Sequence, residues 1–167
     1  VGLSGKDASM IIARKHDGKI KDESNIEKIV DLGFVGVPEK INTGIIEILT
    51  SNDFIPVIAP LGINEEGKTF NINADTVAGA IAHSLNAKRL LVLTDVEGVI
   101  DDQKNVIAEL SKSEAKNLIN NDIISGGMIP KINTCIDAVN NGVTGVVIVD
   151  GRKPHAILFE IFSDKGA

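Results

Sequence analysis

The sequence predicts an α/β fold, in which β-strands alternate with amphipathic helices. Residues 90–94 are a short, continuous apolar run, which is typical of a strand buried on both faces. The preceding segment, residues 74–85, repeats apolar residues every four positions, as one face of a helix requires. A second apolar run over 143–149 is again followed by a helical pattern. With 167 residues and no visible repeat, we expect a single α/β unit over residues 1–167.

The first part of the chain is expected to be rich in strands. Asp17-Gly18 is a dipeptide that commonly closes β-hairpins, so we predict a turn over residues 16–19. A polar, irregular connection over 19–28 should lead into a strand over 29–37, which Pro38 would end because it has no N–H for the ladder.

Further elements follow from apolar patterns. A short helix is expected over 43–51, and the apolar run over 55–61 predicts a buried strand in spite of its two prolines. Together with the helix over 74–85 and the strand over 90–94, this run would form a strand–helix–strand unit with a right-handed crossover.

Three later helices have recognisable start signals. Ser111 and Glu114 make a capping box for a helix that ends near Asn120. Pro130 suits the first turn of the next helix, so Lys131 falls in that turn. Pro154 precedes a last helix with an apolar stripe.

Three polar side chains alternate just before the helix over 74–85. In an extended chain Asn71, Asn73 and Asp75 would share one face, where they could hold a charged ligand. The alternative is structural: Asn73 caps the helix and Asp75 sits in its positive first turn, each contributing roughly 0.5–1 kcal/mol. Both interpretations are compatible with the spacing.

Two more residues suggest a functional site. Asp95 follows the strand over 90–94, at the strand end where open α/β sheets bind ligands, although a simple turn acid is the alternative. Lys131 places a cation near a positive helix start, at a cost of about 0.3–1 kcal/mol. Local rules tend to be broken at functional sites, but an ordinary exposed lysine could also tolerate this cost.

Composition restricts the possible functions. A net charge of −6 and only five aromatic residues, all Phe, argue against a nucleic-acid surface. The single cysteine, Cys135, cannot form an internal disulfide, and no apolar run is long enough to cross a membrane, so we expect a cytoplasmic protein without a membrane partner. Residues 1–5 read as a strand entered midway without an initiator Met, which suggests a fragment of a longer chain.

Five segments, in this order, resemble the acetylglutamate kinases of the amino acid kinase family. They are Gly2–Asp7, Phe70–Asp75, Leu93–Val99, Gly126–Lys131 and Pro154–Ala156. The resemblance covers the whole chain as the C-terminal, nucleotide-binding portion of such an enzyme. It implies a three-layer αβα fold of the carbamate kinase type, with an open, mainly parallel sheet sandwiched between helices. The asparagine pair before Asp75 favours acetylglutamate as the acceptor over uridylate, aspartate or carbamate.

The resemblance also implies an activity and its residues. The activity is ATP-dependent phosphorylation of the side-chain carboxylate of N-acetyl-L-glutamate in arginine biosynthesis, with Mg²⁺ bridging phosphate oxygens. Lys131 would stabilise the transferring phosphoryl group, Asp75 would orient the catalytic lysines, and Asn71 and Asn73 would hold the acetylglutamate. Two segments would line the nucleotide pocket: Asp95, Val96, Glu97, Gly98, Val99 and Ile100, and Ile123, Ile124, Ser125, Gly126, Gly127 and Met128.

Several alternatives accompany this resemblance. The family's first domain carries another catalytic lysine, glycine-rich loops and a substrate-binding arginine without counterparts here, so this chain alone is not expected to be active. In full-length form we expect a homo-oligomer.

The chain could instead belong to another amino acid kinase subfamily or be a non-catalytic nucleotide-binding module. A dinucleotide-binding oxidoreductase is disfavoured because no predicted strand is followed by Gly-x-Gly-x-x-Gly.

Overall fold

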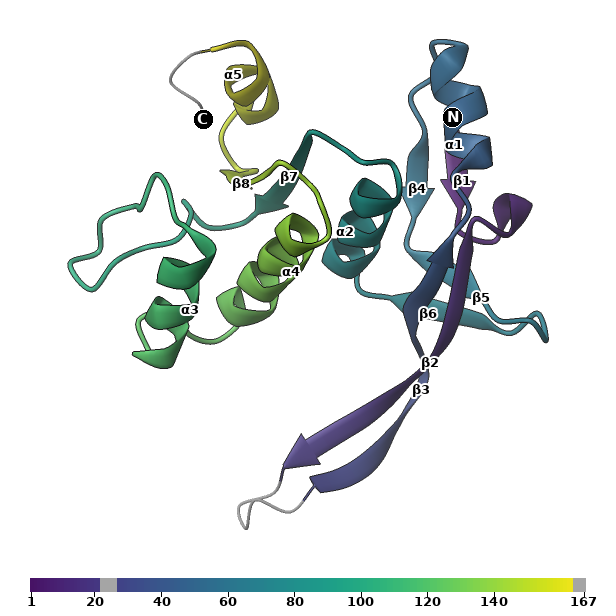
Figure 1. The fold of residues 1–167 in the computed structure, drawn as a ribbon, viewed down its shortest axis with the longest axis horizontal. Helices are drawn as coiled ribbons and strands as arrows, with labels where there is room; N and C mark the ends of the chain where they lie inside the picture. The colour runs from purple at the N-terminus through teal and green to yellow at the C-terminus, as the bar shows by residue number, and fades with distance from the viewer. Residues whose placement is uncertain (22–26, 164–167) are drawn as a thin grey trace. The chain divides into compact units, whose positions relative to one another are not determined.

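The computed structural model describes residues 1–21 and 27–163 (Figure 1). The chain divides into two compact units, Val1–Leu85 and Asn86–Ala167, where the sequence predicted a single one. Each unit combines helices with a parallel pair of strands, in agreement with the predicted α/β class. The two units are described separately below.

The first unit contains two groups of strands. β1 pairs in parallel with β4, whereas β2, β3, β6 and β5 close into a small barrel. A hydrophobic core lies between these strands and α2; its buried members are Met10, Ile11, Ala13, Ile46, Phe70, Ile72 and Val77. The elements are β1 (Gly2–Ser4), η1 (Asp7–Ser9), β2 (Ile11–Lys21), β3 (Glu27–Ile41), α1 (Gly44–Ser51), β4 (Val57–Ala59), β5 (Leu61–Ile63), β6 (Thr69–Ile72) and α2 (Ala74–Ser84).

The β2–β3 hairpin corrects the prediction of a turn at Asp17-Gly18. Both residues pair inside the ladder, with Gly18 opposite Val30. A Cβ on Gly18 would lie 2.7 Å from the Val30 carbonyl oxygen, so the glycine permits close approach of the strands and forms no turn. The connection predicted over 19–28 falls partly outside the described residues, and the ends of this range belong to the two strands.

The prediction that Pro38 ends its strand was also wrong. β3 continues to Ile41, and Pro38 lies opposite Ala13, next to a register shift in β2. A bulge is one of the few places where a strand tolerates a residue without an N–H, because the ladder is already interrupted there.

Residues 55–61 do not form the predicted buried strand. They contribute to two short strands, β4 and β5, on either side of Pro60. Ile55 is 79% exposed and Val57 is 66% exposed. Proline lacks the N–H that a continuous ladder needs, so the run divides where the chain changes from one strand group to the other.

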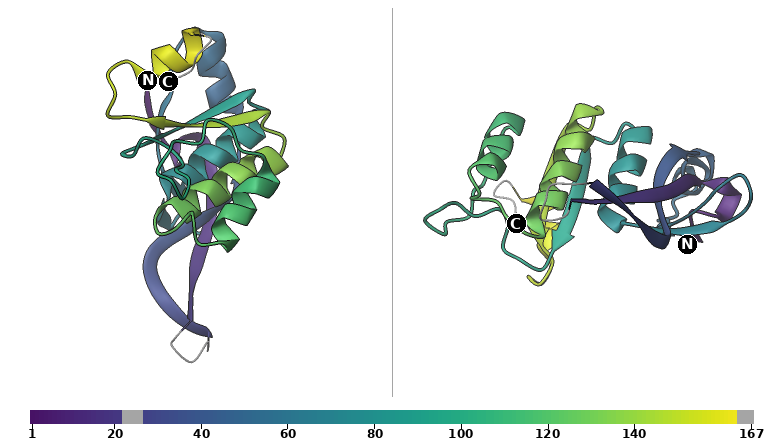
Figure 2. Two further views of the ribbon diagram at one scale, coloured as in Figure 1. Left: turned by 90° about the vertical axis from the view of Figure 1, so that its left-hand side faces the viewer. Right: turned by 90° about the horizontal axis from the view of Figure 1, so that it is seen from below.

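The second unit is built on a parallel strand pair. Its elements are β7 (Arg89–Thr94), α3 (Lys112–Asn120), α4 (Met128–Asn140), β8 (Gly145–Asp150) and α5 (Ala156–Phe162). β7 and β8 pair along their whole length, as the views in Figure 2 show, and α3 and α4 lie in the connection between them. The predicted strand–helix–strand unit from 55–61 to 90–94 does not form, because the two strands belong to different sheets. β4 pairs with β1 in the first unit, and β7 pairs with β8 in the second.

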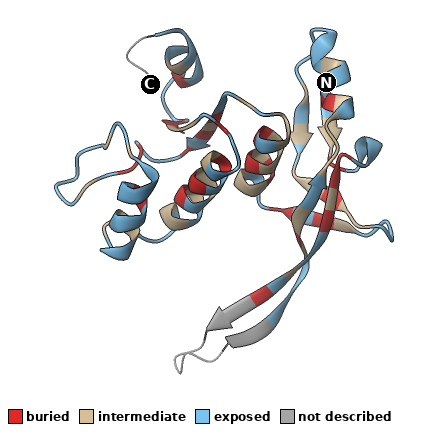
Figure 3. Cartoon of the chain, in the orientation of Figure 1, coloured by how far each residue is buried: buried red, intermediate tan, exposed pale blue. Residues whose placement is uncertain are grey.

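One hydrophobic cluster of the second unit joins α3, α4 and the loops before them. Its buried members are Val99, Ala115, Ile124, Ile132 and Ile136. The buried residues of α4 are Ile132, Ile136 and Ala138 (Figure 3). The capping box of α3 is confirmed, because the Ser111 hydroxyl accepts the Glu114 N–H and the Glu114 carboxylate accepts the Ser111 N–H.

Candidate functional site

The predicted substrate residues follow the chain from β6 into α2 in the first unit. Asn71 is exposed on β6, between the buried Phe70 and Ile72. The Asn73 side chain caps α2, since its Oδ1 accepts the Thr76 N–H at 3.1 Å. The predicted N-cap is therefore confirmed.

This cap corrects the expected common face of three polar residues. Asp75 is the second residue of α2, so only Asn71 and Asn73 keep the spacing of an extended chain. The half-buried Asp75 lies in the first helical turn, where the positive helix end favours a carboxylate.

The two predicted nucleotide segments meet in the core of the second unit. Val99 is 7% exposed and Ile124 is 3% exposed, and both belong to one cluster with Ile132 of α4. Met128 packs against the same cluster. The fold thus brings residues 95–100 and 123–128 together, although they are more than 20 positions apart in the sequence.

The members of these segments differ in what they can offer a ligand. Asp95, Val96, Glu97 and Ile100 are exposed, as are Ser125, Gly126 and Gly127, and Ile123 is half-buried. Val99 and Ile124 are core residues, so their side chains support the segments and do not face solvent. Gly98 is buried with a φ of 145°, a backbone conformation that favours glycine.

Lys131 is the fourth residue of α4 and is half-buried. Pro130 precedes it in the first turn, as predicted, where a missing N–H costs no intrahelical bond. The Met128 N–H bonds the Ser125 carbonyl at 3.4 Å and the Ile129 N–H bonds the Gly126 carbonyl at 3.3 Å. These long bonds already engage the first amides of the helix.

A further polar cluster lies where β7 and β8 end together. Asp150, which is only 6% exposed, closes β8 opposite Thr94 of β7. Arg152 contacts the Asp150 carboxylate through Nε at 2.8 Å and Nη2 at 2.9 Å. The Arg152 side chain holds the pKa of Asp150 at about 2. Asp150, followed by Glu97 and Asp95, raises the pKa of Arg152 in turn.

The sequence analysis missed Asp150 and Arg152. The rule that selected Asp95 could have found them, because Asp150 directly follows the predicted strand over 143–149 just as Asp95 follows the strand over 90–94. The parallel pairing of the two strands places both carboxylates at one sheet edge.

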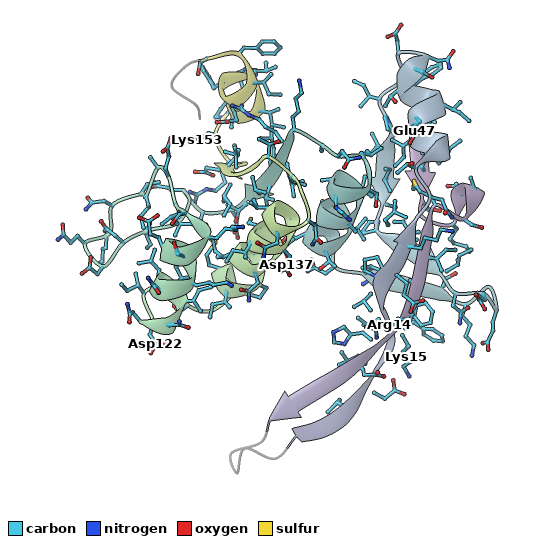
Figure 4. All side chains as sticks on the ribbon, viewed as in Figure 1. Arg14, Lys15, Glu47, Asp122, Asp137 and Lys153 are labelled. Atoms are coloured by element: carbon cyan, nitrogen blue, oxygen red, sulfur yellow. The ribbon has the colours of Figure 1, made fainter. Side chains whose placement is uncertain are left out.

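The first unit also contains a pocket of about 610 Å³ beside the barrel. Its cations are paired with carboxylates: Arg14 Nε lies 3.7 Å from Glu39 and Lys15 Nζ lies 2.6 Å from Asp31. Figure 4 labels Arg14 and Lys15 on β2. The predicted substrate residues do not line this pocket, so we do not assign the acceptor to it.

Two searches of the described residues bear on metals and membranes. In residues 1–21 and 27–163, no group of three or more His, Cys, Asp or Glu side chains could hold a metal ion by itself. Among the helices that the structure describes, none is long and apolar enough to cross a membrane.

Comparison with known proteins identifies the family. The profile of the Amino acid kinase family matches residues 1–150. The chain belongs to the amino acid kinase family. One relative, the acetylglutamate kinase of Parvibaculum lavamentivorans, is 56% identical to this chain over 168 residues. The alignment covers 100% of this chain and 55% of that protein. The chain therefore spans about half the length of the curated relatives it matches.

Two solved structures have a similar fold. One is N-acetylglutamate synthase from Neisseria gonorrhoeae, complexed with coenzyme A and L-arginine. It aligns with a TM-score of 0.82 and 27% sequence identity, and the alignment covers 99% of this chain and 36% of the synthase chain. A Giardia carbamate kinase matches 89% of this chain and 56% of its own at a TM-score of 0.64 and 20% identity. These likenesses confirm the predicted α/β fold of the carbamate kinase type.

Proposed function

We propose that this chain is the nucleotide-binding portion of an acetylglutamate kinase. The enzyme would transfer the γ-phosphoryl group of ATP to the side-chain carboxylate of N-acetyl-L-glutamate, forming N-acetyl-L-glutamyl 5-phosphate in cytoplasmic arginine biosynthesis. The observation that carries the proposal is 56% identity, over the whole chain, with a relative named acetylglutamate kinase.

The reaction needs charge stabilisation more than a protein nucleophile. The acceptor carboxylate is already ionised near neutral pH, so no general base is required before attack. One of its oxygens bonds the γ-phosphorus while the bond to the β,γ-bridging oxygen breaks, and ADP leaves with that electron pair. Catalysis of this step is mostly positioning and neutralisation of charge on the phosphoryl oxygens.

We assign the charge stabilisation to Lys131. It lies in the first turn of α4, in the same unit as both nucleotide segments, and next to the buried Ile132 that anchors the helix in the core. An ammonium there would balance negative charge that develops on the transferring group.

We assign the acceptor to the segment between β6 and α2. The exposed Asn71 amide would hold the acetylglutamate, and Asn73 would assist while its Oδ1 caps the helix. Asp75, at the start of α2, would orient the catalytic lysines through its charge.

We assign the nucleotide to Asp95–Ile100 and Ile123–Met128, whose exposed members are available for contact. Mg²⁺ usually takes one or two protein carboxylates together with substrate phosphates. Mg²⁺ would enter with ATP and would neutralise negative charge on its phosphates.

A chimaeric enzyme tests this proposal. The matching segment of the Parvibaculum lavamentivorans kinase would be replaced by this chain, and acyl phosphate would be trapped as a hydroxamate with MgATP and N-acetyl-L-glutamate. Turnover of this acceptor at a rate within about tenfold of the parent enzyme supports the proposal. Turnover of aspartate instead assigns another subfamily, and nucleotide binding without any turnover assigns a non-catalytic module. Gel filtration of the same chimaera tests whether the complete enzyme is a homo-oligomer, as we also propose.

A further inference from the structure

The turn after β8 is built around one ion pair, between the buried Asp150 carboxylate and the exposed Arg152 guanidinium. The Asp150 Oδ1 accepts hydrogen bonds from the Arg152 backbone N–H at 3.0 Å and from Nε at 2.8 Å. Its Oδ2 accepts from Arg152 Nη2 at 2.9 Å. The planar fork of the guanidinium is therefore held at both oxygens, and such two-point pairs define geometry better than a single contact.

This turn is tied to the end of β7. The Gly151 N–H donates to the Thr94 carbonyl at 2.8 Å, directly after the last residue pair of the ladder, Thr94 with Asp150. A Cβ on Gly151 would lie 3.3 Å from that carbonyl oxygen, so the two strand ends approach closely. Lys153, labelled in Figure 4, completes the turn by donating its N–H to the Asp150 carbonyl at 3.2 Å.

Thr94 is also where the predicted nucleotide segment Asp95–Ile100 begins. The Thr94 hydroxyl donates to the Asp95 carboxylate at 3.4 Å. Besides Asp150, the charges of Asp95 and Glu97 act on Arg152. Hydrogen bonds thus fix the turn of Asp150, Gly151 and Arg152 at Thr94, directly before the acidic start of the nucleotide segment.

Direct binding of a nucleotide phosphate to Arg152 is less consistent with this geometry. Two donors of its guanidinium, Nε and Nη2, are already bonded to Asp150. Three carboxylates, those of Asp95, Glu97 and Asp150, act on Arg152, so the local charge does not favour an anion.

We propose that Arg152 is a positioning residue: anchored on Asp150, it holds Asp95–Ile100 in the conformation that binds the nucleotide. The nucleotide part of this statement rests on the proposed function, whereas the anchoring of the segment does not. The alternative is that the pair only stabilises the fold.

Hydrogen exchange on the chain itself tests the anchoring. Arg152→Ala should accelerate exchange of the amides of residues 95–100 by about tenfold or more, because local opening becomes easier. Arg89→Ala is the matched control, since Arg89 forms the other arginine–carboxylate pair of the unit, with Glu160 at 3.3 Å, and its side chain is 60% exposed against 57% for Arg152. Unchanged exchange over 95–100 in Arg152→Ala overturns the proposal.

Steady-state kinetics of the chimaera test the functional part. Arg152→Ala should raise the KM for ATP by about tenfold, with the KM for acetylglutamate and kcat within about twofold. A loss of stability alone would lower the active fraction and therefore the apparent kcat, without moving one KM selectively. Arg152→Lys, which keeps the charge and remains available if the alanine variant does not fold, should recover little, because an ammonium cannot form the two-point contact.

A double-variant comparison separates the remaining outcomes. If Arg152 acts through its anchor, Asp150→Asn should produce the same change in KM, and the double variant should add little to either. Equal changes in both KM values, or full additivity, overturn the positioning role. An inactive wild-type chimaera whose segment still responds to Arg152→Ala in hydrogen exchange contradicts the proposed function but supports the anchoring.

Discussion

Lys131 illustrates how one residue can oppose a local rule. A cation in the first turn of α4 opposes the helix dipole, at a cost of about 0.3–1 kcal/mol. The fold places this residue in the same unit as both predicted nucleotide segments, whose buried members share a core with its neighbour Ile132.

We predict that Lys131→Met in the chimaera lowers kcat by roughly 10²–10³-fold, the scale expected for losing one preorganised electrostatic group. The urea midpoint of the same variant should stay unchanged or rise slightly, because the unfavourable dipole interaction is lost. Lys131→Arg should restore little activity, since a planar guanidinium does not reproduce a point charge. A parallel fall in turnover and midpoint would show that Lys131 is mainly structural.

Asp150 makes a residue-level prediction about pH. Hydrogen bonds from Arg152 hold its pKa at about 2, below the ordinary value of 3.8. A carboxyl group whose pKa is lower in the folded state stabilises the fold above its unfolded pKa, and this stabilisation disappears as the pH falls from about 4 to about 2. The difference in urea midpoint between the wild type and Asp150→Asn should therefore be largest near neutral pH and shrink over this interval.

The comparison with Asp150→Asn isolates this one carboxyl group. The pKa values of Asp31, Asp101 and Glu114 are also lowered by hydrogen bonds, but these groups are the same in both proteins. The pKa of Asp150 is about 2. If the difference in urea midpoint stays constant down to that pH, the assignment of the stabilisation to this carboxyl group is wrong.

At the scale of elements, the β2–β3 hairpin depends on close strand contact. A Cβ atom added to Gly18 would lie 2.7 Å from the Val30 carbonyl oxygen and 2.8 Å from the Leu32 side chain. A backbone atom cannot move aside without distorting the ladder, so a methyl group there must shift the strands.

We predict that Gly18→Ala destabilises the protein by about 1–3 kcal/mol, as other overpacking substitutions do. Gly44→Ala is the control, because nothing lies within 4 Å of its Cβ position at the start of α1. The control should change the free energy of unfolding by no more than about 0.5 kcal/mol. Equal urea midpoints for the two variants would show that the strands accommodate a side chain at Gly18.

At the scale of the whole molecule, the chain spans about half of its curated relatives. We predict that the isolated chain forms no acyl phosphate from MgATP and N-acetyl-L-glutamate and binds MgATP weakly, because we expect the complete enzyme to need contacts from outside this segment. A hydroxamate assay on the isolated chain, with the chimaera as the positive control, measures this. Clear hydroxamate formation by the chain alone would refute the prediction.

Features that depend on near neighbours were predictable from the sequence. Asn73 caps α2 and Ser111 pairs with Glu114 because the partners lie three positions away, so no distant contact is needed. The strand predicted over 90–94 is present as β7 (Arg89–Thr94), because its continuous apolar run suits a strand wherever it pairs. Its burial on both faces was not confirmed, since Leu93 is 47% exposed. The segments that carry the family resemblance likewise led to the α/β fold that the solved structures confirm.

Only the tertiary structure decided which segments, far apart in the sequence, would pair or pack against one another. Gly18 resembled a turn residue until Val30 and Leu32 were found beside it, and residues 55–61 resembled a buried strand until the chain divided them at Pro60. Parallel pairing brings Asp150 opposite Thr94, 56 positions earlier in the chain. Local patterns record backbone hydrogen bonds within a few residues, whereas register, burial and charge clusters depend on which distant segments meet.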